Sequence, residues 1–580
     1  MLFRVIHLLP ALVIRTSMNR FTVLGSFIVG IAGAVLIRLF FLQVFQTDMY
    51  VQTAAKQHAV ALSSLPTRGN IFFVDKQGTL VPAAVTKRMY TLAGNPQKIT
   101  DPTKVYDELA HILSLDKEEF LSHASATSPY GVFLKDIPKE KAEELMSLQI
   151  PGLWIVEEEG RVYPEGLAGS HALGFVGYGD NERIGRYGVE QQYEKTLAGL
   201  EKNSTEKESK GGFLFSFANS LLSEKKDGAD IILTIDPHIQ SISHQITTEL
   251  MEQWDATSAG ILVMQPKTGA ILAMESLPSF DPNAYNTVQN YDVFLNPFTQ
   301  KSFEMGSIVK PLTMAAGLDA YAVSENTTYY DAGFVRVRDA EIKNYDGKGR
   351  GLQSMYDILD QSLNTGAVFI MQQLGMRQFR DYMEQFGLGS VTGIDLPQEI
   401  AGNMKNLEVG RDVEYATASF GQGIATTPLA LATALSAIAN GGELVRPYVV
   451  SRVMEGNMVI AETAPFVRRR VLRQETTEIV SRMLSKVVDN TLAGGLVAMP
   501  GYHIAAKTGT AQMANADGSG YSDQYLHAFF GYAPAFDPQF LILLFLEKPV
   551  GVRYASQTLA EPFHKLSEFI IHYYGILPDK

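Results

Sequence analysis

A long uncharged apolar stretch lies close to the N-terminus of the chain. Residues 21–37 contain no charged side chain, and the apolar run resumes after Arg38 as far as Phe45. A stretch of about 25 residues is long enough for one tilted transmembrane helix, which needs about 17–25. Three arginines lie among residues 1–20, and positive charge on this side indicates a cytoplasmic N-terminus. We therefore predict a cytoplasmic segment over residues 1–20 and a transmembrane anchor over residues 21–45.

A cleaved signal peptide is the alternative interpretation of this stretch. Ala32-Gly33-Ala34 resembles a cleavage site, but apolar sequence continues past it without a break, which favours an uncleaved anchor. Arg38 would then extend its charged end to the outer membrane interface. Residues 1–17 are dispensable for such an anchor, and Met18 is a candidate start of the native protein.

Beyond the anchor, the pattern of apolar and polar positions changes twice. Residues 46–225 mix short strand-like and helix-like segments and contain no complete set of catalytic residues. In "LSLDKEEF", Ser114 is followed by two glutamates, which predicts a helix N-cap. From residue 231 onward, apolar runs alternate with helix-like stretches. This alternation indicates strands packed between helices, with a helical lobe inserted around residues 305–440.

Length and composition favour a multidomain globular protein. The chain has 580 residues, and a typical domain has about 100–200. We therefore expect more than one domain. A hydrophobic content of 46% with 19% charged residues is ordinary for a chain with a core. The net charge of −13, without a basic stripe, argues against a nucleic-acid partner. The chain has no cysteine, which excludes disulfides, thiol catalysis and thiolate metal sites. The histidines show no metal-ligand spacing, so we predict neither a metal site nor a cofactor.

Three short motifs follow one another in the C-terminal half of the chain. They are Ser307-Ile308-Val309-Lys310, Ser362-Leu363-Asn364 and Lys507-Thr508-Gly509. Together they supply a serine nucleophile, its base, a bridging hydroxyl and amide, and a second cation beside a substrate-binding strand. Each motif also recurs elsewhere, for example as Lys267-Thr268-Gly269, so local context has to separate functional copies from chance matches.

Ser307 lies at the predicted start of a helix. It opens the apolar run "SIVKPLTMAAGL", in which Pro311 occupies the first turn, where a missing N–H costs little. The hydroxyl and the backbone N–H of Ser307 would then lie at the positive end of the helix dipole. Lys310 follows three residues later on the same face, where it can take the hydroxyl proton. Lys310 is an effective base only if its pKa falls, and burial and a nearby second cation, Lys507, would both lower it.

The two Lys-Thr-Gly triplets differ in their surroundings. Lys267-Thr268-Gly269 joins two apolar runs, which predicts a hairpin turn with an exposed lysine. Lys507 lies in "YHIAAKTGTAQM", where small residues leave room for a ligand backbone beside an edge strand. Thr508 and Thr510 add hydroxyl donors next to the lysine, which suits a substrate carboxylate. We therefore predict that the triplet ending at Gly509 is the functional copy.

Around these motifs the chain resembles the class B penicillin-binding proteins, the monofunctional peptidoglycan transpeptidases. The matching stretches run from about residue 21 to near the C-terminus. They include "RLFFLQVFQTDMY", "LPTRGNIF", "RVYPEGLAGSHALGFVG", "YGVEQQYEKTLAG", "LTIDPHIQ", "GLGSVTGIDLP", "ASFGQGIATTPLALATALSAIANGG" and "HAFFGYAP". The chain departs from the family at Met305, where Pro is more usual, and at Ile308-Val309, where Thr-Phe is more usual. Because the catalytic pair is kept, the departure bears only on how substrates and β-lactams fit.

The resemblance implies a multidomain α/β fold with a single N-terminal transmembrane helix. An α+β pedestal domain, of the penicillin-binding protein dimerisation type, would cover residues 46–225. The transpeptidase domain would cover residues 226–580, with an antiparallel sheet between helices and an all-helical lobe. Arg68, Arg161 and Glu190 fall in the pedestal, and we interpret their charges as structural hydrogen-bonding groups.

The resemblance also implies a mechanism. Ser307 would attack the carbonyl between two D-alanines of a peptidoglycan stem peptide, and Lys310 would take its proton. Ser362 would relay a proton to the leaving amine, and Asn364 would hold the peptide amide. Lys507 is the second cation of the catalytic set.

The substrate-binding strand has its own implied roles. Lys507 and the following Thr508, Gly509 and Thr510 would bind the terminal carboxylate. The backbone N–H groups of Ser307 and Thr510 would hold the oxyanion. The family also has Gly421-Gln422-Gly423 near the site, although a tight turn explains these residues equally well.

An amine of a neighbouring stem peptide would then take the acyl group and form the cross-link. The same serine would be acylated by β-lactams. The resemblance implies a single-pass protein of the bacterial inner membrane with an extracytoplasmic catalytic domain. It also implies a partner that contacts the anchor and the pedestal, namely a polytopic membrane glycosyltransferase of the shape, elongation, division and sporulation type.

Three other functions share parts of this pattern. A carboxypeptidase or β-lactamase would need a base for the deacylating water, and the nearest candidate is Glu399 in "DLPQEIAGN", which lacks the class A Glu-x-x-Leu-Asn motif. A bifunctional enzyme would need a glycosyltransferase motif before residue 226, and none is present. A non-catalytic β-lactam-binding sensor or scaffold would share the three motifs, and a sensor would also carry further spans or a signalling domain.

Overall fold

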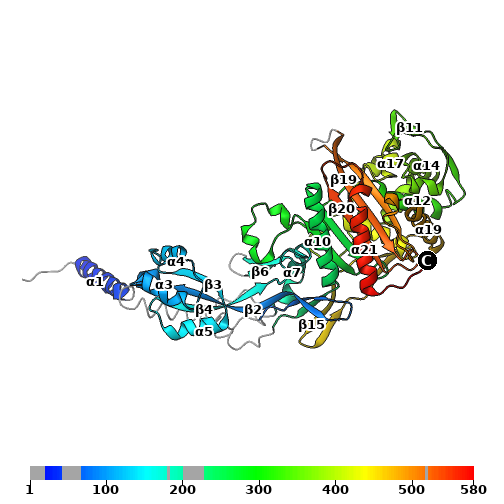
Figure 1. Cartoon of the computed structure of the whole chain (residues 1–580). Helices are drawn as coiled ribbons and strands as arrows, with labels where there is room; N and C mark the ends of the chain where they lie inside the picture. The colour runs from blue at the N-terminus through cyan, green and yellow to red at the C-terminus, as the bar shows by residue number, and fades with distance from the viewer. Residues whose placement is uncertain (1–19, 42–66, 179–182, 200–226, 491, 516–519) are drawn as a thin grey trace, which may run out of the picture. The chain divides into compact units, whose positions relative to one another are not determined.

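The computed structural model describes residues 20–41, 67–178, 183–199, 227–490, 492–515 and 520–580. They belong to two compact units, of which the first contains α1 (Arg20–Phe40) and the segment Met89–Glu158 (Figure 1). The remaining described residues form the second unit. α1 covers most of the predicted anchor, and residues 42–45 of that prediction lie outside the described residues. Among the helices of the described ranges, none is long and apolar enough to cross a membrane.

In the first unit, short helices pack against a small β-sheet. The second half of β2 (Leu80–Gly94) pairs with β3 (Gly131–Ile137), and β4 (Leu153–Val162) also pairs with β2. The helices are η2 (Pro96–Lys98), α3 (Pro102–Ala110), α4 (Lys117–Ala124) and α5 (Lys139–Leu148). Leu109, Phe120 and Phe133 are buried in one cluster between these elements.

The start of α4 corrects one prediction. The side chain of Asp116, not that of Ser114, accepts the capping hydrogen bond from the N–H of Glu119 at 2.8 Å. Ser114 is exposed two residues upstream. Both residue types cap helices, and a carboxylate has the further advantage of its charge at the positive end of the helix.

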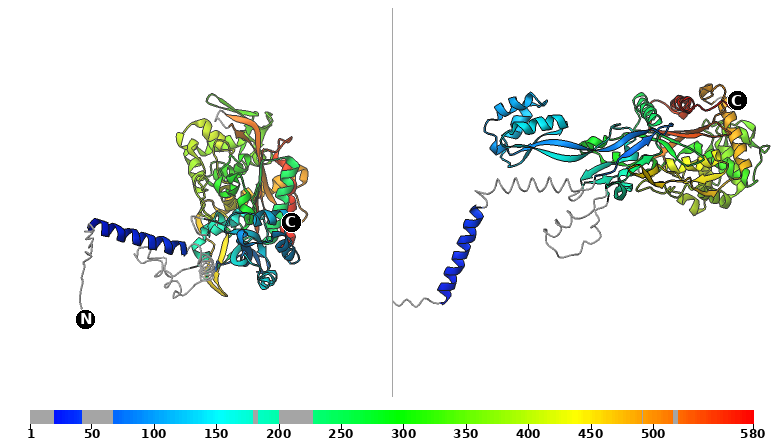
Figure 2. Two further views of the ribbon diagram at one scale, coloured as in Figure 1. Left: turned by 90° about the vertical axis from the view of Figure 1, so that its left-hand side faces the viewer. Right: turned by 90° about the horizontal axis from the view of Figure 1, so that it is seen from below.

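The second unit is built around a five-stranded antiparallel sheet. The strands, in spatial order, are β18 (Ala505–Ala514), β19 (Tyr521–Ala533), β20 (Phe540–Glu547), β8 (Ser258–Met264) and β9 (Ile271–Leu277). α10 (Pro237–Trp254) and α21 (Ala560–Tyr574) pack on one face, and α18 (Pro428–Ala439) and α19 (Gln474–Asn490) on the other. The left view of Figure 2 shows strands between helices on both sides.

The sheet is buried on both faces, and the sequence of β20 is apolar for this reason. Leu541 and Leu543 belong to the hydrophobic cluster on one face, and Ile542 and Leu544 to the cluster on the other. Successive side chains of a strand point to opposite faces, so a strand between two helical layers must be apolar throughout. The predicted arrangement of strands between helices is therefore present.

The lobe that carries the first two motifs is mixed rather than all-helical. Its helices are α12 (Lys310–Asp319), α13 (Met355–Asp360), α14 (Asn364–Leu374), α15 (Met376–Gln385), α16 (Lys405–Val409) and α17 (Asp412–Ala418), in addition to α18. It also contains two antiparallel strand pairs, β10 (Thr328–Asp331) with β13 (Gly351–Ser354) and β11 (Phe334–Val337) with β12 (Ala340–Lys343). The prediction of an all-helical lobe is wrong, because strands of four residues are too short for the alternating pattern to distinguish them from loops.

A second sheet brings early strands of the chain beside later ones within the second unit. β1 (Ile71–Val74) pairs in parallel with β7 (Asp230–Leu233) and antiparallel with the first half of β2. β7 pairs antiparallel with β15 (Val450–Glu455), which pairs with β16 (Met458–Glu462). The other elements of the unit are α6 (Ser170–Leu173), β5 (Phe175–Tyr178), β6 (Arg183–Arg186), α7 (Gly188–Gln192), α8 (Glu194–Leu197), η3 (Pro282–Thr287), η4 (Tyr291–Phe294), α11 (Pro297–Gln300), η5 (Gly306–Val309), β14 (Glu443–Val445), β17 (Val467–Arg470), η6 (Leu492–Gly495) and α20 (Ala555–Thr558).

A buried ionic network lies among these early segments. Glu190 is fully buried, and its two carboxylate oxygens accept hydrogen bonds from Arg161 Nε at 2.7 Å and Arg68 Nε at 2.9 Å. Arg161 Nη1 also donates to the carbonyl oxygen of Gly69 at 2.7 Å and to the hydroxyl of Thr86 at 3.0 Å. These charges hold backbone segments together, as predicted for structural hydrogen-bonding groups.

Candidate active site

The first motif forms a tight turn that leads into a buried helix. η5 covers Gly306–Val309, and α12 begins at Lys310, so Ser307 lies at a helix start, where the sequence places it. Ser307 is partly exposed and lines a cavity of about 760 Å³, whereas Lys310 is only 1% exposed. The turn therefore presents the serine to the cavity and keeps the lysine beneath it.

The ammonium group of Lys310 is held by the second motif. Its Nζ donates to the carbonyl oxygen of Ser362 at 2.6 Å, to the Ser362 hydroxyl at 3.2 Å and to Oδ1 of Asn364 at 2.8 Å. These acceptors match the three donors of an ammonium group. Within the described residues, no hydrogen bond joins Lys310 to the hydroxyl of Ser307. In this resting arrangement Lys310 connects the first two motifs instead of pairing with the nucleophile.

Ser362 has an unusual backbone conformation at the point where the motifs meet. Its φ of 53° lies in the left-handed region, which costs a non-glycine residue about 1–3 kcal/mol and recurs at functional sites. Lys310 donates a hydrogen bond to the carbonyl oxygen of Ser362. Two residues later, Asn364 Nδ2 donates to the carbonyl oxygen of Lys343 at 2.9 Å. The surrounding contacts thus stabilise a strained turn that aims the Ser362 hydroxyl at both lysines.

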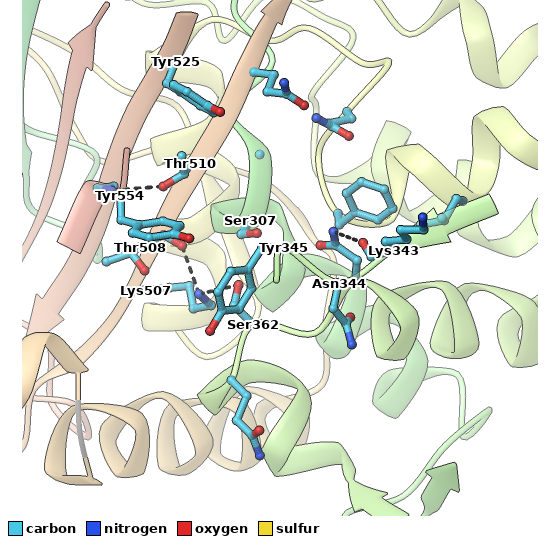
Figure 3. A pocket seen from close by; sticks show the side chains of 18 of the residues that line it. Ser307, Lys343, Asn344, Tyr345, Ser362, Lys507, Thr508, Thr510, Tyr525 and Tyr554 are labelled. Carbon is cyan, nitrogen blue, oxygen red and sulfur yellow. Dashed lines mark hydrogen bonds between the residues drawn. The ribbon is translucent and has the colours of Figure 1, made fainter. Parts of the chain in front are cut away.

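The third motif lies on β18, at the edge of the five-stranded sheet. Lys507 is 2% exposed, and its Nζ donates to the Ser362 hydroxyl at 3.1 Å and to the carbonyl oxygen of Thr508 at 3.0 Å (Figure 3). One hydroxyl oxygen therefore lies within hydrogen-bond distance of both lysines. Burial lowers the pKa of Lys507 to about 8, against an opposing effect of Asp360. Burial and the charge of Lys507 hold the pKa of Lys310 well below its ordinary value.

Two glycines allow backbone segments to meet at the site. A Cβ on Gly509 would lie 2.9 Å from the carbonyl oxygen of Met305, so only a glycine lets β18 pass so close to the turn of Ser307. A Cβ on Gly421 would lie 2.2 Å from the carbonyl oxygen of Gly306, and the φ of Gly421 is +82°. Gly421 therefore has two roles: it forms a turn, and it lets the backbone pass close to the turn of Ser307. The next residue, Gln422, lines the cavity.

The remaining predicted residues lie around the same cavity. Ser362, Asn364, Lys507, Thr508 and Thr510 all line it together with Ser307. The hydroxyl oxygen of Thr510 accepts a hydrogen bond from the N–H of Ala555 at 3.0 Å, which leaves its own O–H free to donate. The structure thus brings the side chains from all three motifs to one place.

Sequence reasoning missed several residues of the cavity wall. Tyr345 and Tyr554 form an edge-to-face ring pair with centroids 5.9 Å apart, and both line the cavity (Figure 3). Tyr525, Lys343 and Arg553 line it as well. Most of these residues lie on loops between elements, where no periodicity marks them, and no motif includes them.

Lys267 and Glu399 both lie outside the cavity lining and have structural roles. Lys267 lies in the turn between β8 and β9, half exposed, and pairs with Asp537 at the surface, as predicted. Glu399 accepts hydrogen bonds from Thr392 and Gly393 at 2.6–2.9 Å, so its carboxylate stabilises a loop. No group of three or more histidine, aspartate or glutamate side chains in the described ranges could hold a metal ion.

Comparisons with known proteins agree with this geometry. The family model of the penicillin-binding protein transpeptidase domain matches residues 259–568, and that of the penicillin-binding protein dimerisation domain matches residues 63–233. Stage V sporulation protein D of Bacillus subtilis is 31% identical, over 90% of this chain and 81% of that protein. Peptidoglycan D,D-transpeptidase FtsI of Escherichia coli is 26% identical, over 97% of this chain and 92% of that protein.

A solved structure has the same fold. Penicillin-binding protein 3 from Mycobacterium tuberculosis, complexed with aztreonam, superposes with a TM-score of 0.67 at 22% identity, over 89% of this chain and 98% of that one. Both family models match in the order expected of a two-domain transpeptidase. The chain therefore belongs to the class B penicillin-binding proteins and is a peptidoglycan D,D-transpeptidase.

Proposed function

We propose that Ser307 is the residue acylated in this transpeptidase. It attacks the carbonyl carbon between two D-alanines at the end of a stem peptide, and the terminal D-alanine leaves as its amine is protonated. An amine of a neighbouring stem peptide then attacks the acyl-enzyme and forms the cross-link. The observation that carries this proposal is the convergence of Lys310 and Lys507 on the hydroxyl of Ser362 beside Ser307.

The low pKa of Lys310 supports its role as the base. The lowered pKa makes the neutral form of Lys310 more abundant. Neutral Nζ has a free lone pair, which can accept the proton of the Ser307 hydroxyl as the bond to carbon forms. When the C–N bond breaks, the proton must reach the leaving amine. The Ser362 hydroxyl lies 3.2 Å from Lys310 Nζ and can transfer it, while Asn364 binds the peptide amide.

The residues of the edge strand β18 bind the substrate. Lys507, with the backbone of Gly509 and the hydroxyls of Thr508 and Thr510, binds the terminal carboxylate, since charge-assisted hydrogen bonds are the strongest available here. The N–H groups of Ser307 and Thr510 hold the oxyanion. Gly509 and Gly306 permit the close backbone contact that this requires. Loss of one such donor typically costs about 10²–10³ in rate.

β-Lactams carry a carboxylate and a strained amide, and they should acylate the same serine. Aztreonam is bound in the related penicillin-binding protein 3 structure. Met305 is buried beside the turn, where it affects the position of the turn rather than the chemistry. We infer covalent inhibition by β-lactams at Ser307.

The domain and membrane assignments are also proposals. Residues 1–20 would be cytoplasmic, residues 21–45 an anchor in the inner membrane, residues 46–225 the pedestal and residues 226–580 the extracytoplasmic transpeptidase domain. The apolar sequence of the anchor and the arginines before it support this topology. A polytopic membrane glycosyltransferase would be the partner of the anchor and pedestal.

Labelling of the full-length, detergent-solubilised protein with a fluorescent penicillin, followed by mass mapping of the adduct, tests the central proposal. We expect one adduct, on Ser307, which Ser307→Ala abolishes. Ser114→Ala is the matched control, because Ser114 belongs to an exposed Ser-x-x-Lys match and should not affect labelling. An adduct elsewhere, or no adduct on folded protein, would contradict the proposal. Release of D-alanine without cross-links would indicate a hydrolase instead.

A further inference from the structure

One cation of the cavity wall has no role in the chemistry described above. Lys507 binds Ser362, and Lys343 pairs with Glu341 at 3.1 Å. Arg553 also lines the cavity and is exposed, yet no ion pair to it is found in the described part of the chain. In a protein with a net charge of −13, an unpaired arginine facing a substrate cavity indicates an anionic ligand group.

The backbone that carries Arg553 is fixed to the substrate-binding strand at two points. His527 Nε2 donates to the carbonyl oxygen of Arg553 at 3.0 Å, and the N–H of Ala555 donates to the Thr510 hydroxyl at 3.0 Å. Thr510 and His527 are directly opposite each other in the β18–β19 pair. His527 is fully buried, and burial lowers its pKa to about 4, so it is neutral and cannot be the charge partner of Arg553. Both attachments therefore hold the arginine at a defined distance from Thr510.

The side chain of Arg553 is also restrained. Its guanidinium lies 5.5 Å from the ring centroid of Tyr554, within range of a cation–π contact. Tyr554 in turn meets the ring of Tyr345. A planar guanidinium held beside a ring keeps its fork of donors available for bidentate binding of a carboxylate.

The upper limit on the separation of Arg553 from Thr510 is comparable with the length of a stem peptide. Arg553 is two residues from Ala555, which contacts Thr510, and two residues span at most about 7 Å. If the terminal carboxylate of the donor lies on Lys507 and Thr510, the residue before the two D-alanines is also about two residues away. The side chain of that residue can therefore reach the guanidinium of Arg553.

We propose that Arg553 is a specificity-determining residue that binds a second, free carboxylate on the donor stem peptide, borne by the side chain of the residue before the two D-alanines. A diamino diacid at that position provides this carboxylate, whereas lysine or an amidated diacid does not. The inference rests on the proposed function, because it places the terminal carboxylate at Lys507 and Thr510.

The test uses full-length protein in detergent and two peptides ending in D-Ala-D-Ala that differ only in whether this side-chain carboxylate is free or amidated. Each peptide competes with fluorescent penicillin for Ser307, and D-alanine release is measured in parallel. For the wild type we expect about a tenfold preference for the free carboxylate, because one charge-assisted hydrogen-bonded pair contributes about this factor. Arg553→Ala should lose the preference, and Arg553→Lys should retain part of it because it keeps the charge without the fork.

Arg446→Ala is the matched control. Arg446 is exposed and lies 5.4 Å from the Phe466 ring centroid, outside the cavity lining, so its loss should leave the preference intact. Equal competition by both peptides in the wild type, or a preference that survives Arg553→Ala, would overturn the inference. Failure of penicillin to label Ser307 in the wild type would count against the proposed function, not against the role of Arg553.

Discussion

A Cβ atom on Gly509 would lie 3.1 Å from the backbone nitrogen of Ile308. The strand of the third motif and the turn of the first are therefore in direct backbone contact. The distance between the nucleophile and the carboxylate-binding strand is set by main chain, which is far stiffer than a long side chain.

Gly509→Ala tests this relationship. The added methyl group would also come within 2.9 Å of the Met305 carbonyl oxygen, so the strand or the turn must move. We expect the second-order rate of penicillin acylation to fall by about 10²-fold, the effect of a displacement of about 1 Å at a reacting centre. Thermal unfolding should show a loss of about 1–3 kcal/mol from overpacking.

Gly131→Ala is the control for that substitution. A Cβ at Gly131 would meet its nearest neighbour, Pro96, at an ordinary 3.5 Å. Its acylation rate should stay at the wild-type level. If Gly509→Ala acylates as fast as the control, the backbone contact does not position the site.

The pH dependence of acylation should be bell-shaped. Lys310 acts as base only when neutral, so the rate rises as pH increases through its lowered pKa. Lys507 binds the carboxylate only when charged, and its pKa is about 8, so the rate falls above about pH 8. Because the lysines interact, the two apparent values belong to the pair.

Lys507→Arg separates the two arms of this profile. A guanidinium stays charged throughout the accessible pH range, so the falling arm should move to higher pH while the rising arm remains. Stopped-flow acylation by penicillin across pH 5–10 measures both arms. A falling arm that stays near pH 8 in Lys507→Arg would show that another group causes it.

The ring pair at the cavity wall should restrict large ligands. Loss of an edge-to-face pair removes about 0.5–1.5 kcal/mol, so Tyr345→Ala frees Tyr554 to move. We expect acylation by a β-lactam with a bulky side chain to become about two- to tenfold faster, and acylation by a small one to change less. Tyr345→Phe keeps both rings and should behave as the wild type. Equal acceleration for both drugs would argue against a steric role.

The buried network around Glu190 should matter for stability rather than for catalysis. Glu190→Ala leaves the guanidinium groups of Arg68 and Arg161 without their shared carboxylate, and breaking a buried pair in this way costs about 3–5 kcal/mol. Glu325→Ala removes an exposed pair with Arg482 and should cost less than about 1 kcal/mol. Chemical denaturation compares the two variants. Similar losses in both would contradict a structural role for the network.

The sequence predicted which motif side chains meet at the site better than it predicted the walls of the cavity. Ser307 and Lys310 could be placed because helix periodicity puts residues three apart on one face. The left-handed conformation of Ser362 could not be predicted, because it is stabilised by Lys310 and by neighbours distant in sequence. Tyr345 and Tyr554 come together from loops that are far apart along the chain, which no local pattern indicates.

The fold, like the site, was predicted only in part from the sequence. Long apolar strands such as β20 carry a strong signal because both of their faces are buried. The four-residue strands of the lobe carry almost none, so the lobe was expected to be all-helical. The close contact made by Gly421 with Gly306 could not be distinguished from an ordinary turn, because a positive φ and a crowded backbone both require glycine.

The parallel pairing of Ile71 with Ile231 and the network of Glu190 have a consequence for how this protein can be divided. A fragment that begins at residue 226 would contain all three motifs, but β7 would lose the neighbour that β1 provides. An unpaired strand edge of this kind promotes aggregation. A stable catalytic fragment would therefore have to include residues 67–88 and 159–199, so the structural unit that holds the site is discontinuous along the chain.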